Sequence, residues 1–129
     1  MAATKDIEAP ERAGARYGFP AYAGDLFYGR AIVGVNAAGE ARPAGSAGVV
    51  ALLGLCEERI DNSNGATGDQ IVECLRGRYR YPVAGATHAD IGKPVYALDD
   101  NSLQLTNAGG ELKLGVLEAI DADGMWIKI

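Results

Sequence analysis

Hydrophobic positions in this chain recur in short runs with a period of two, and turns rich in Gly, Asp and Asn separate the runs. The clearest case is Ser102 to Thr106, where Leu103 and Leu105 alternate with polar residues. No stretch of ten or more residues carries the 3.6-residue period of an amphipathic helix. The pattern therefore predicts an all-β domain of about six to eight strands, arranged as a sandwich or a barrel.

The turn signals divide the chain into candidate strands and two clear hairpins. The hairpin turns are expected at Asp99-Asp100-Asn101 and at Asp121 to Gly124. An interior glycine often marks a bulge, so the long segment from Asp69 is expected to bend at Gly77. The predicted strand segments are Leu26 to Val35, Glu40 to Pro43, Val49 to Ile60, Asp69 to Val83, Pro94 to Leu98, Ser102 to Thr106, Leu112 to Ile120 and Met125 to Ile129.

Two pairs of short segments resemble each other within the chain. Leu53-Gly54-Leu55-Cys56-Glu57 is similar to Leu114-Gly115-Val116-Leu117-Glu118. Gly24-Asp25-Leu26-Phe27-Tyr28 is similar to Gly92-Lys93-Pro94-Val95-Tyr96. The similarity predicts two alike strand-hairpin-strand units whose apolar faces share one core.

The first 24 residues differ from the rest, because charges of both signs mix with Ala, Gly and Pro and no period is visible. We therefore predict an extended N-terminal arm over residues 1–24 and a single β domain over residues 25–129. The arm carries three aromatic residues, Tyr17, Phe19 and Tyr22. They are candidates for anchors that dock onto another surface, and packing against their own domain is the alternative.

Size and charge limit the possible functions. A chain of 129 residues fits one domain. A net charge of −5 disfavours nucleic acid and anionic membranes as partners. The longest largely apolar uncharged run, Pro43 to Cys56, is too short to span a membrane. The first residues lack the apolar segment of a secretory signal, so we expect synthesis in the cytoplasm, with Cys56 and Cys74 as reduced, packed thiols.

The chemistry of the residues gives no catalytic, cofactor or metal site. The one histidine, His88, lies in a turn-like stretch without triad or metal-ligand spacing. Neither of the common glycine-rich phosphate-binding motifs is present. Neighbouring carboxylates such as Asp121 and Asp123 fall in predicted turns, where Asp is a common turn former. The sequence therefore does not predict an enzyme.

One group of charges has a regular spacing. Arg76, Arg78 and Arg80 recur at every second position, which on a strand places them on one face. Arginines in this arrangement could bind carboxylates of a partner protein. The alternative is a solvated sheet edge that discourages strand pairing.

Several segments together resemble the small capsid decoration, or cement, proteins of tailed bacteriophages. The segments that carry the resemblance are Gly24 to Tyr28, Leu53 to Leu55, Gly92 to Tyr96 with the hairpin that follows, Leu114 to Glu118, and Met125 to Ile129. The resemblance covers about residues 25–129.

The resemblance implies a compact β-barrel or β-tulip-like domain that assembles as a homotrimer. Such trimers lie at three-fold and quasi-three-fold positions outside the expanded head of the virion and clamp neighbouring major capsid subunits. The family implies no catalytic residues and no cofactor. Its binding elements are an N-terminal arm and the capsid-facing edge of the domain, which correspond by position to Met1 to Gly24 and to the strand from Arg76 to Tyr81.

Two other functions remain open. A small-molecule-binding β-barrel would carry polar groups at its mouth, for which Tyr28, Gln70 and Gln104 are candidates. A head-fibre or host-contact module would use the arm to attach to the capsid and the β domain to contact the host.

Overall fold

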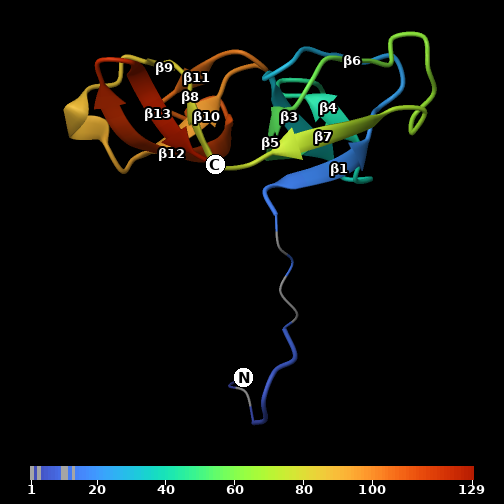
Figure 1. Ribbon diagram of the computed structural model, residues 1–129, viewed down its shortest axis with the longest axis horizontal. Coiled ribbons are helices and arrows are strands. Elements are labelled where there is room, and N and C mark those ends of the chain that lie inside the picture. The colour runs from blue at the N-terminus through green and yellow to red at the C-terminus, as the bar shows by residue number, and fades with distance from the viewer. Residues whose placement is uncertain (1, 3, 10–11, 13) are drawn as a thin grey trace.

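In the part of the chain that the computed structural model describes, residues 2, 4–9, 12 and 14–129, thirteen strands and one short 3-10 helix form (Figure 1). The first seven strands are β1 (Arg16–Pro20), β2 (Leu26–Phe27), β3 (Ile32–Asn36), β4 (Ala41–Pro43), β5 (Val49–Cys56), β6 (Ile60–Asp61) and β7 (Ile71–Leu75). The remaining elements are β8 (Arg78–Arg80), β9 (Val83–Ala84), η1 (His88–Asp90), β10 (Pro94–Ala97), β11 (Leu103–Gln104), β12 (Leu112–Asp121) and β13 (Gly124–Lys128). The predicted all-β class is confirmed.

The strands form three sheets. A five-stranded sheet has the order β1-β7-β5-β3-β4, a six-stranded sheet has the order β8-β13-β12-β10-β11-β9, and β2 pairs with β6. Both predicted hairpins are confirmed, since β10 pairs antiparallel with β11 and β12 with β13. The turns form as expected: Asp121 Oδ1 accepts hydrogen bonds from the backbone N–H groups of Asp123 and Gly124.

The six-stranded sheet curls strongly. Its two edge strands, β8 and β9, are consecutive in the chain and only Tyr81 and Pro82 separate them. β8 pairs antiparallel with β13, whereas β9 pairs parallel with β11. One segment therefore lines both edges of the sheet. The described strands nevertheless form open sheets, and the arrangement is a compact β-sandwich rather than a closed barrel.

The two large sheets repeat one topology. Strands β1, β7, β5, β3 and β4 occupy the same positions as β8, β13, β12, β10 and β11. Residue Ala21 makes a parallel bridge to Ala41 in the first sheet, as Val83 does to Leu103 in the second. We call residues 15–76 the first repeat and residues 77–129 the second repeat, and they form the two lobes of Figure 1.

The register of the strands agrees between the repeats in detail. In the first repeat Val33 lies opposite Gly54, and the pairing then shifts by one residue. In the second repeat Val95 lies opposite Gly115, with the same shift at the next residue. The predicted similarity of Leu53–Glu57 to Leu114–Glu118 is therefore structural. The other predicted similarity is wrong in register, because Gly92 corresponds to Arg30 and not to Gly24: both donate backbone N–H groups to equivalent carbonyls, those of Leu117 and Cys56.

A close backbone approach explains the glycines in this bulge. A Cβ on Gly54 would lie 2.2 Å from the carbonyl oxygen of Leu75, and one on Gly115 would lie 2.1 Å from that of Lys128. Leu75 and Lys128 are equivalent residues on β7 and β13. Only glycine lets these strands come so close.

Two apolar cores lie in the described part of the chain, one inside each repeat. The first core contains Val33, Leu53 and Cys56, and the second contains Leu117, Ile127 and other residues of the second repeat. The first repeat also adds three buried side chains to the second core, those of Ile32, Ala44 and Leu55. Successive side chains on a strand point to opposite faces, so β3 and β5 supply both cores at once.

The structure shortens the predicted arm. Arg16 to Pro20 forms β1, which pairs antiparallel with β7, and Ala21 is fully buried in the first core. The described residues before Gly14 are exposed and project away from both repeats (Figure 1). The boundary between arm and domain therefore lies before Arg16 and not at Gly24, because the short alternation in Arg16 to Pro20 suffices for an edge strand.

Burial changes along β5 and along the segment that follows β6. Val50 is exposed and only the second half of β5 is buried. The segment Asp61 to Gly68 is mostly exposed, but Asn62 is buried within it. The side-chain amide of Asn62 donates to the backbone oxygens of Tyr22 and Ala66, which ties the loop to the segment after β1.

We predict that Gly54→Ala and Gly115→Ala each lower the free energy of unfolding by about 2–4 kcal/mol, because the added methyl group meets backbone atoms that cannot move independently. Chemical denaturation measures the effect. Gly29→Ala is the matched control, because its nearest neighbouring atom would lie 3.7 Å away, and it should change stability by less than about 0.5 kcal/mol. Equal effects at all three glycines would contradict the close-approach argument.

Candidate interaction surfaces

The structure separates the three arginines that the sequence places on one strand. β7 ends before Arg76, whose side chain donates from Nε to the carbonyl oxygen of Leu53 at 2.8 Å. Gly77 then adopts φ +149°, and Arg78 and Arg80 lie on β8 in the other sheet. The predicted bend at Gly77 is confirmed, and for that reason the prediction of a single three-arginine face is wrong.

Arg78 and Arg80 belong to a larger face, which we call the outer face of the second repeat. Residues opposite each other in register project to the same side of a sheet. Lys128 lies opposite both Arg78 and Val116, and Trp126 lies opposite Arg80. The outer face consists of Arg78, Arg80, Pro94, Tyr96, Lys113, Val116, Glu118, Trp126 and Lys128.

The outer face is cationic although the protein is acidic overall. Its four cations are exposed, and its one carboxylate, Glu118, accepts from Arg78 Nε at 2.6 Å. Among the described residues the other carboxylate oxygen, Oε2 of Glu118, is buried and has no hydrogen-bond partner. Val116 and Trp126 give the face a partly exposed apolar centre. An acidic surface with some apolar area would be its complement.

The same ion pair occurs in both repeats. Arg16 NH2 lies 2.7 Å from Glu57 Oε1, and Arg78 Nε lies 2.6 Å from Glu118 Oε1. Arg16 and Arg78 are equivalent, and so are Glu57 and Glu118. Both arginines are more than half exposed, so each pair contributes at most about 1 kcal/mol to stability.

The three aromatic residues of the predicted arm make contacts within their own chain. The hydroxyl of Tyr17 donates to the carbonyl oxygen of Gly14 at 2.7 Å, and Phe19 packs against the first core. Tyr22 lies under the guanidinium of Arg42, 4.1 Å from it. All three aromatic side chains are half-buried, so each keeps some exposed surface.

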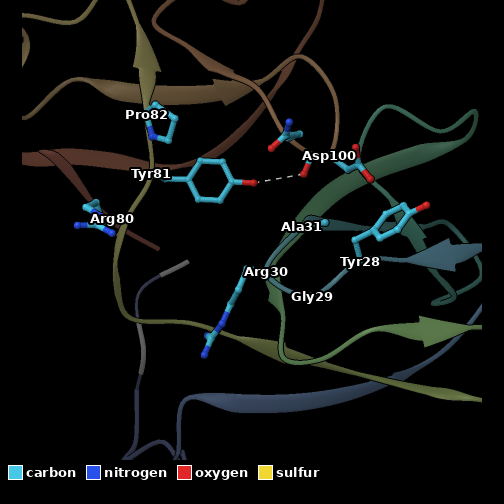
Figure 2. Close-up of a pocket in the computed structure, with 9 residues that line it drawn as sticks. Tyr28, Gly29, Arg30, Ala31, Arg80, Tyr81, Pro82 and Asp100 are labelled. Carbon is cyan, nitrogen blue, oxygen red and sulfur yellow. Dashed lines mark hydrogen bonds between the residues drawn. The ribbon is translucent and has the colours of Figure 1, made fainter.

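A cleft of about 620 Å³ lies at the junction of the two repeats (Figure 2). One wall comes from the segment between β2 and β3, and the others come from the end of β8 and the turn after β10. In Figure 2, Tyr81 lies between Arg80 and Asp100, and its hydroxyl is 3.4 Å from the backbone oxygen of Asp100. The lining residues are Tyr28 to Ala31, Arg80 to Pro82, Asp100 and Asn101.

The backbone of Arg30 in this cleft is unusual. Among the described residues it is the one non-glycine with a positive φ, at 66°. The equivalent residue in the second repeat, Gly92, has φ +91°. The fold therefore favours glycine here, and an L-residue costs about 1–2 kcal/mol in this conformation. Strained residues of this kind cluster at binding sites.

The two cations of the cleft differ in their contacts, since Arg80 Nη1 donates a hydrogen bond to the carbonyl oxygen of Asp123 at 3.4 Å. Among the described residues, no carboxylate lies within ion-pair distance of Arg30 or Arg80. The nearest aromatic contact of the Arg30 guanidinium is the ring of Tyr79 at 5.6 Å. Burial and the neighbouring charge of Asp99 raise the pKa of Asp100, so the carboxylate in this cleft is not stabilised by either arginine.

The two cysteines lie in the first repeat and the histidine lies in the second. Cys56 and Cys74 lie opposite each other on β5 and β7 as free, buried thiols, as predicted, and burial raises the pKa of Cys74 to about 12. His88 is exposed, with Nε2 3.2 Å from the carbonyl oxygen of Ile120. No group of three or more metal-ligating side chains occurs in the described part of the chain. Within the same residues, no helix has the length and apolar character needed to cross a membrane.

Comparison with protein-family models, with curated proteins and with solved structures finds no match for this chain. Three residues of the cleft and the outer face, Arg30, Lys113 and Lys128, were not predicted from the sequence. The similarity of Arg16-Tyr17-Gly18-Phe19-Pro20 to Arg78-Tyr79-Arg80-Tyr81-Pro82 would have located β1, β8 and the repeat boundary.

We predict that Arg30→Gly raises the free energy of unfolding by about 1 kcal/mol, because glycine adopts the positive φ without strain. Arg59→Gly is the matched control: Arg59 does not have a positive φ, and glycine there should lower stability by increasing the entropy of the unfolded chain. Chemical denaturation of both variants measures the difference. A loss of stability in Arg30→Gly equal to that of the control would show that the backbone at position 30 is not strained.

We predict that Asp100→Asn raises the melting temperature at neutral pH. A raised pKa means that folding disfavours the charged carboxylate, so Asp100 lowers stability above its folded-state pKa and stops doing so as the pH falls below its unfolded-state value. The gain from the variant should therefore disappear in acid. Thermal unfolding followed at several pH values tests this, and a gain that does not change with pH would contradict it.

Proposed function

We propose that the protein is a capsid decoration protein of a tailed bacteriophage, which binds outside the expanded head of the virion. It acts as a homotrimer at three-fold and quasi-three-fold positions and clamps neighbouring major capsid subunits. The observation that carries the proposal is the outer face of the second repeat, a broad and partly apolar cationic surface on an acidic protein. The net charge of −5 disfavours nucleic acid and anionic membranes as partners, and the resemblance in the sequence favours a protein partner.

The architecture suits a role in which many contacts act together. A trimer on a symmetric shell presents the same face three times, and linkage of the copies raises the effective concentration of each contact. Individually modest interfaces then become collectively strong. A rigid two-repeat domain also holds the cations of the outer face in fixed positions, so little side-chain and loop ordering is needed on binding.

Co-sedimentation tests the proposal. Purified protein is mixed with expanded and unexpanded heads of the phage that encodes it, and the bound copies per head are counted. Saturable binding to expanded heads, with a copy number that matches trimers at every three-fold and quasi-three-fold position, is expected. No binding to either form would refute the proposal.

A second candidate function, small-molecule binding, is favoured by the cleft between the repeats. Its volume of about 620 Å³ lies within the range of ligand sites, and it combines tyrosine rings with two guanidinium groups. A head-fibre or host-contact role would instead leave the outer face free on the assembled particle and place the host contact on the β domain.

We predict that Lys113→Ser combined with Lys128→Ser weakens binding to expanded heads by about tenfold or more, because both ammonium groups lie on the outer face. The loss should grow at low ionic strength, where exposed charges are less screened. The control is Arg59→Ser with Lys93→Ser, which removes the same charge elsewhere. Equal weakening by both double variants would show that only net charge matters.

A further inference from the structure

We infer that the cleft between the repeats binds the carboxylates of Asp6 and Glu8 in the N-terminal arm of a second copy of this chain. This inference rests on the proposed assembly into trimers and identifies the contact that joins the copies. The cleft shares Arg80 with the outer face that is proposed to bind the capsid, and its other lining residues lie outside that face.

Arg30 lowers the stability of its own domain. The equivalent position in the second repeat is Gly92, and both residues adopt a positive φ. A glycine at position 30 would adopt this conformation without strain, so the arginine lowers the stability of the fold. The Arg30 side chain forms no ion pair with any described residue that would offset this loss. The side chain is then explained by something that it binds outside its own domain.

The side chains that line the cleft suit a carboxylate ligand. Arg30 and Arg80 come from different repeats and both line it. Guanidinium groups bind carboxylates through paired, charge-assisted hydrogen bonds. Tyr28, which is 56% exposed, and Pro82 add apolar area beside them. The ligand that fits is an extended segment that carries carboxylates.

The N-terminal arm carries two carboxylates on an exposed segment. Residues 4–9 are exposed and run away from the domain in Figure 1. In an extended segment alternate side chains project to one side, about 7 Å apart, so Asp6 and Glu8 can face the cleft together. Ile7, between them, is 72% exposed and projects to the opposite side, where a nitroxide label would not block the carboxylates.

Such a contact also determines how copies of the chain can assemble. A contact between the arm of one copy and the cleft of the next is heterologous, since it joins two different surfaces. Heterologous contacts close into rings when the rotation allows it, and a trimer is such a ring. The arm loses conformational entropy when it docks, and it covers a large surface with few residues.

Paramagnetic labelling in a mixed sample tests the inference with the full chain. One batch carries Ile7→Cys with a nitroxide on the new thiol, since Cys56 and Cys74 are buried and the pKa of Cys74 is about 12. The other batch is isotope-labelled and carries no nitroxide. At millimolar concentration, the amide signals of Tyr28 to Ala31 and of Tyr81 should broaden in the isotope-labelled copy.

Variants in the isotope-labelled copy make the result specific. Arg30→Gly keeps the backbone conformation and removes the guanidinium, and it should weaken the contact about tenfold or more. Arg16→Ser, an exposed arginine outside the cleft, should leave the broadening unchanged. Asp6→Asn with Glu8→Gln in the nitroxide copy should weaken it like Arg30→Gly.

Two outcomes would overturn the inference. They are no broadening between copies, and broadening that Arg30→Gly does not reduce. Co-sedimentation of the same variants with heads separates this failure from that of the proposed function. Saturable head binding without an arm contact refutes the inference alone, and an arm contact without head binding refutes the proposed function alone.

Discussion

The packing of Ile32 and Leu55 into the second core is the interaction on which the rest of the structure depends. Their neighbours Val33 and Cys56 fill the first core, so one pair of strands holds two cores together. Burial of each large apolar side chain is worth about 1.5–3 kcal/mol. Without this packing the two repeats would not meet, and the cleft between them would not exist.

The outer face of the second repeat differs in polarity from its counterpart in the first repeat. It is equivalent to the face of the first repeat that covers the second core. Lys113 stands where the first repeat has Leu52, and Lys128 stands where it has Leu75. The substitutions that keep this face in water also make it cationic, which is why we assign it to an acidic protein partner.

The alternating pattern of apolar residues predicted the all-β class, the turn residues predicted both hairpins, and an interior glycine predicted the bend at Gly77. It could not show which sheet a strand joins, because a strand on either side of Gly77 has the same period. Arg76 was therefore grouped with Arg78 and Arg80, although it contacts Leu53 in the first repeat. The strain at Arg30 could not be predicted either, since the sequence alone does not show that Arg30 and Gly92 are equivalent positions with a positive φ.

The orientation of the bound protein tests the account most directly, and electron cryo-microscopy of expanded heads saturated with it measures that orientation. The account predicts density at three-fold and quasi-three-fold positions, with strands β8, β13 and β12 facing the shell and Lys113 and Lys128 at the contact. Density in which this face points to solvent, or heads without added density, would contradict it.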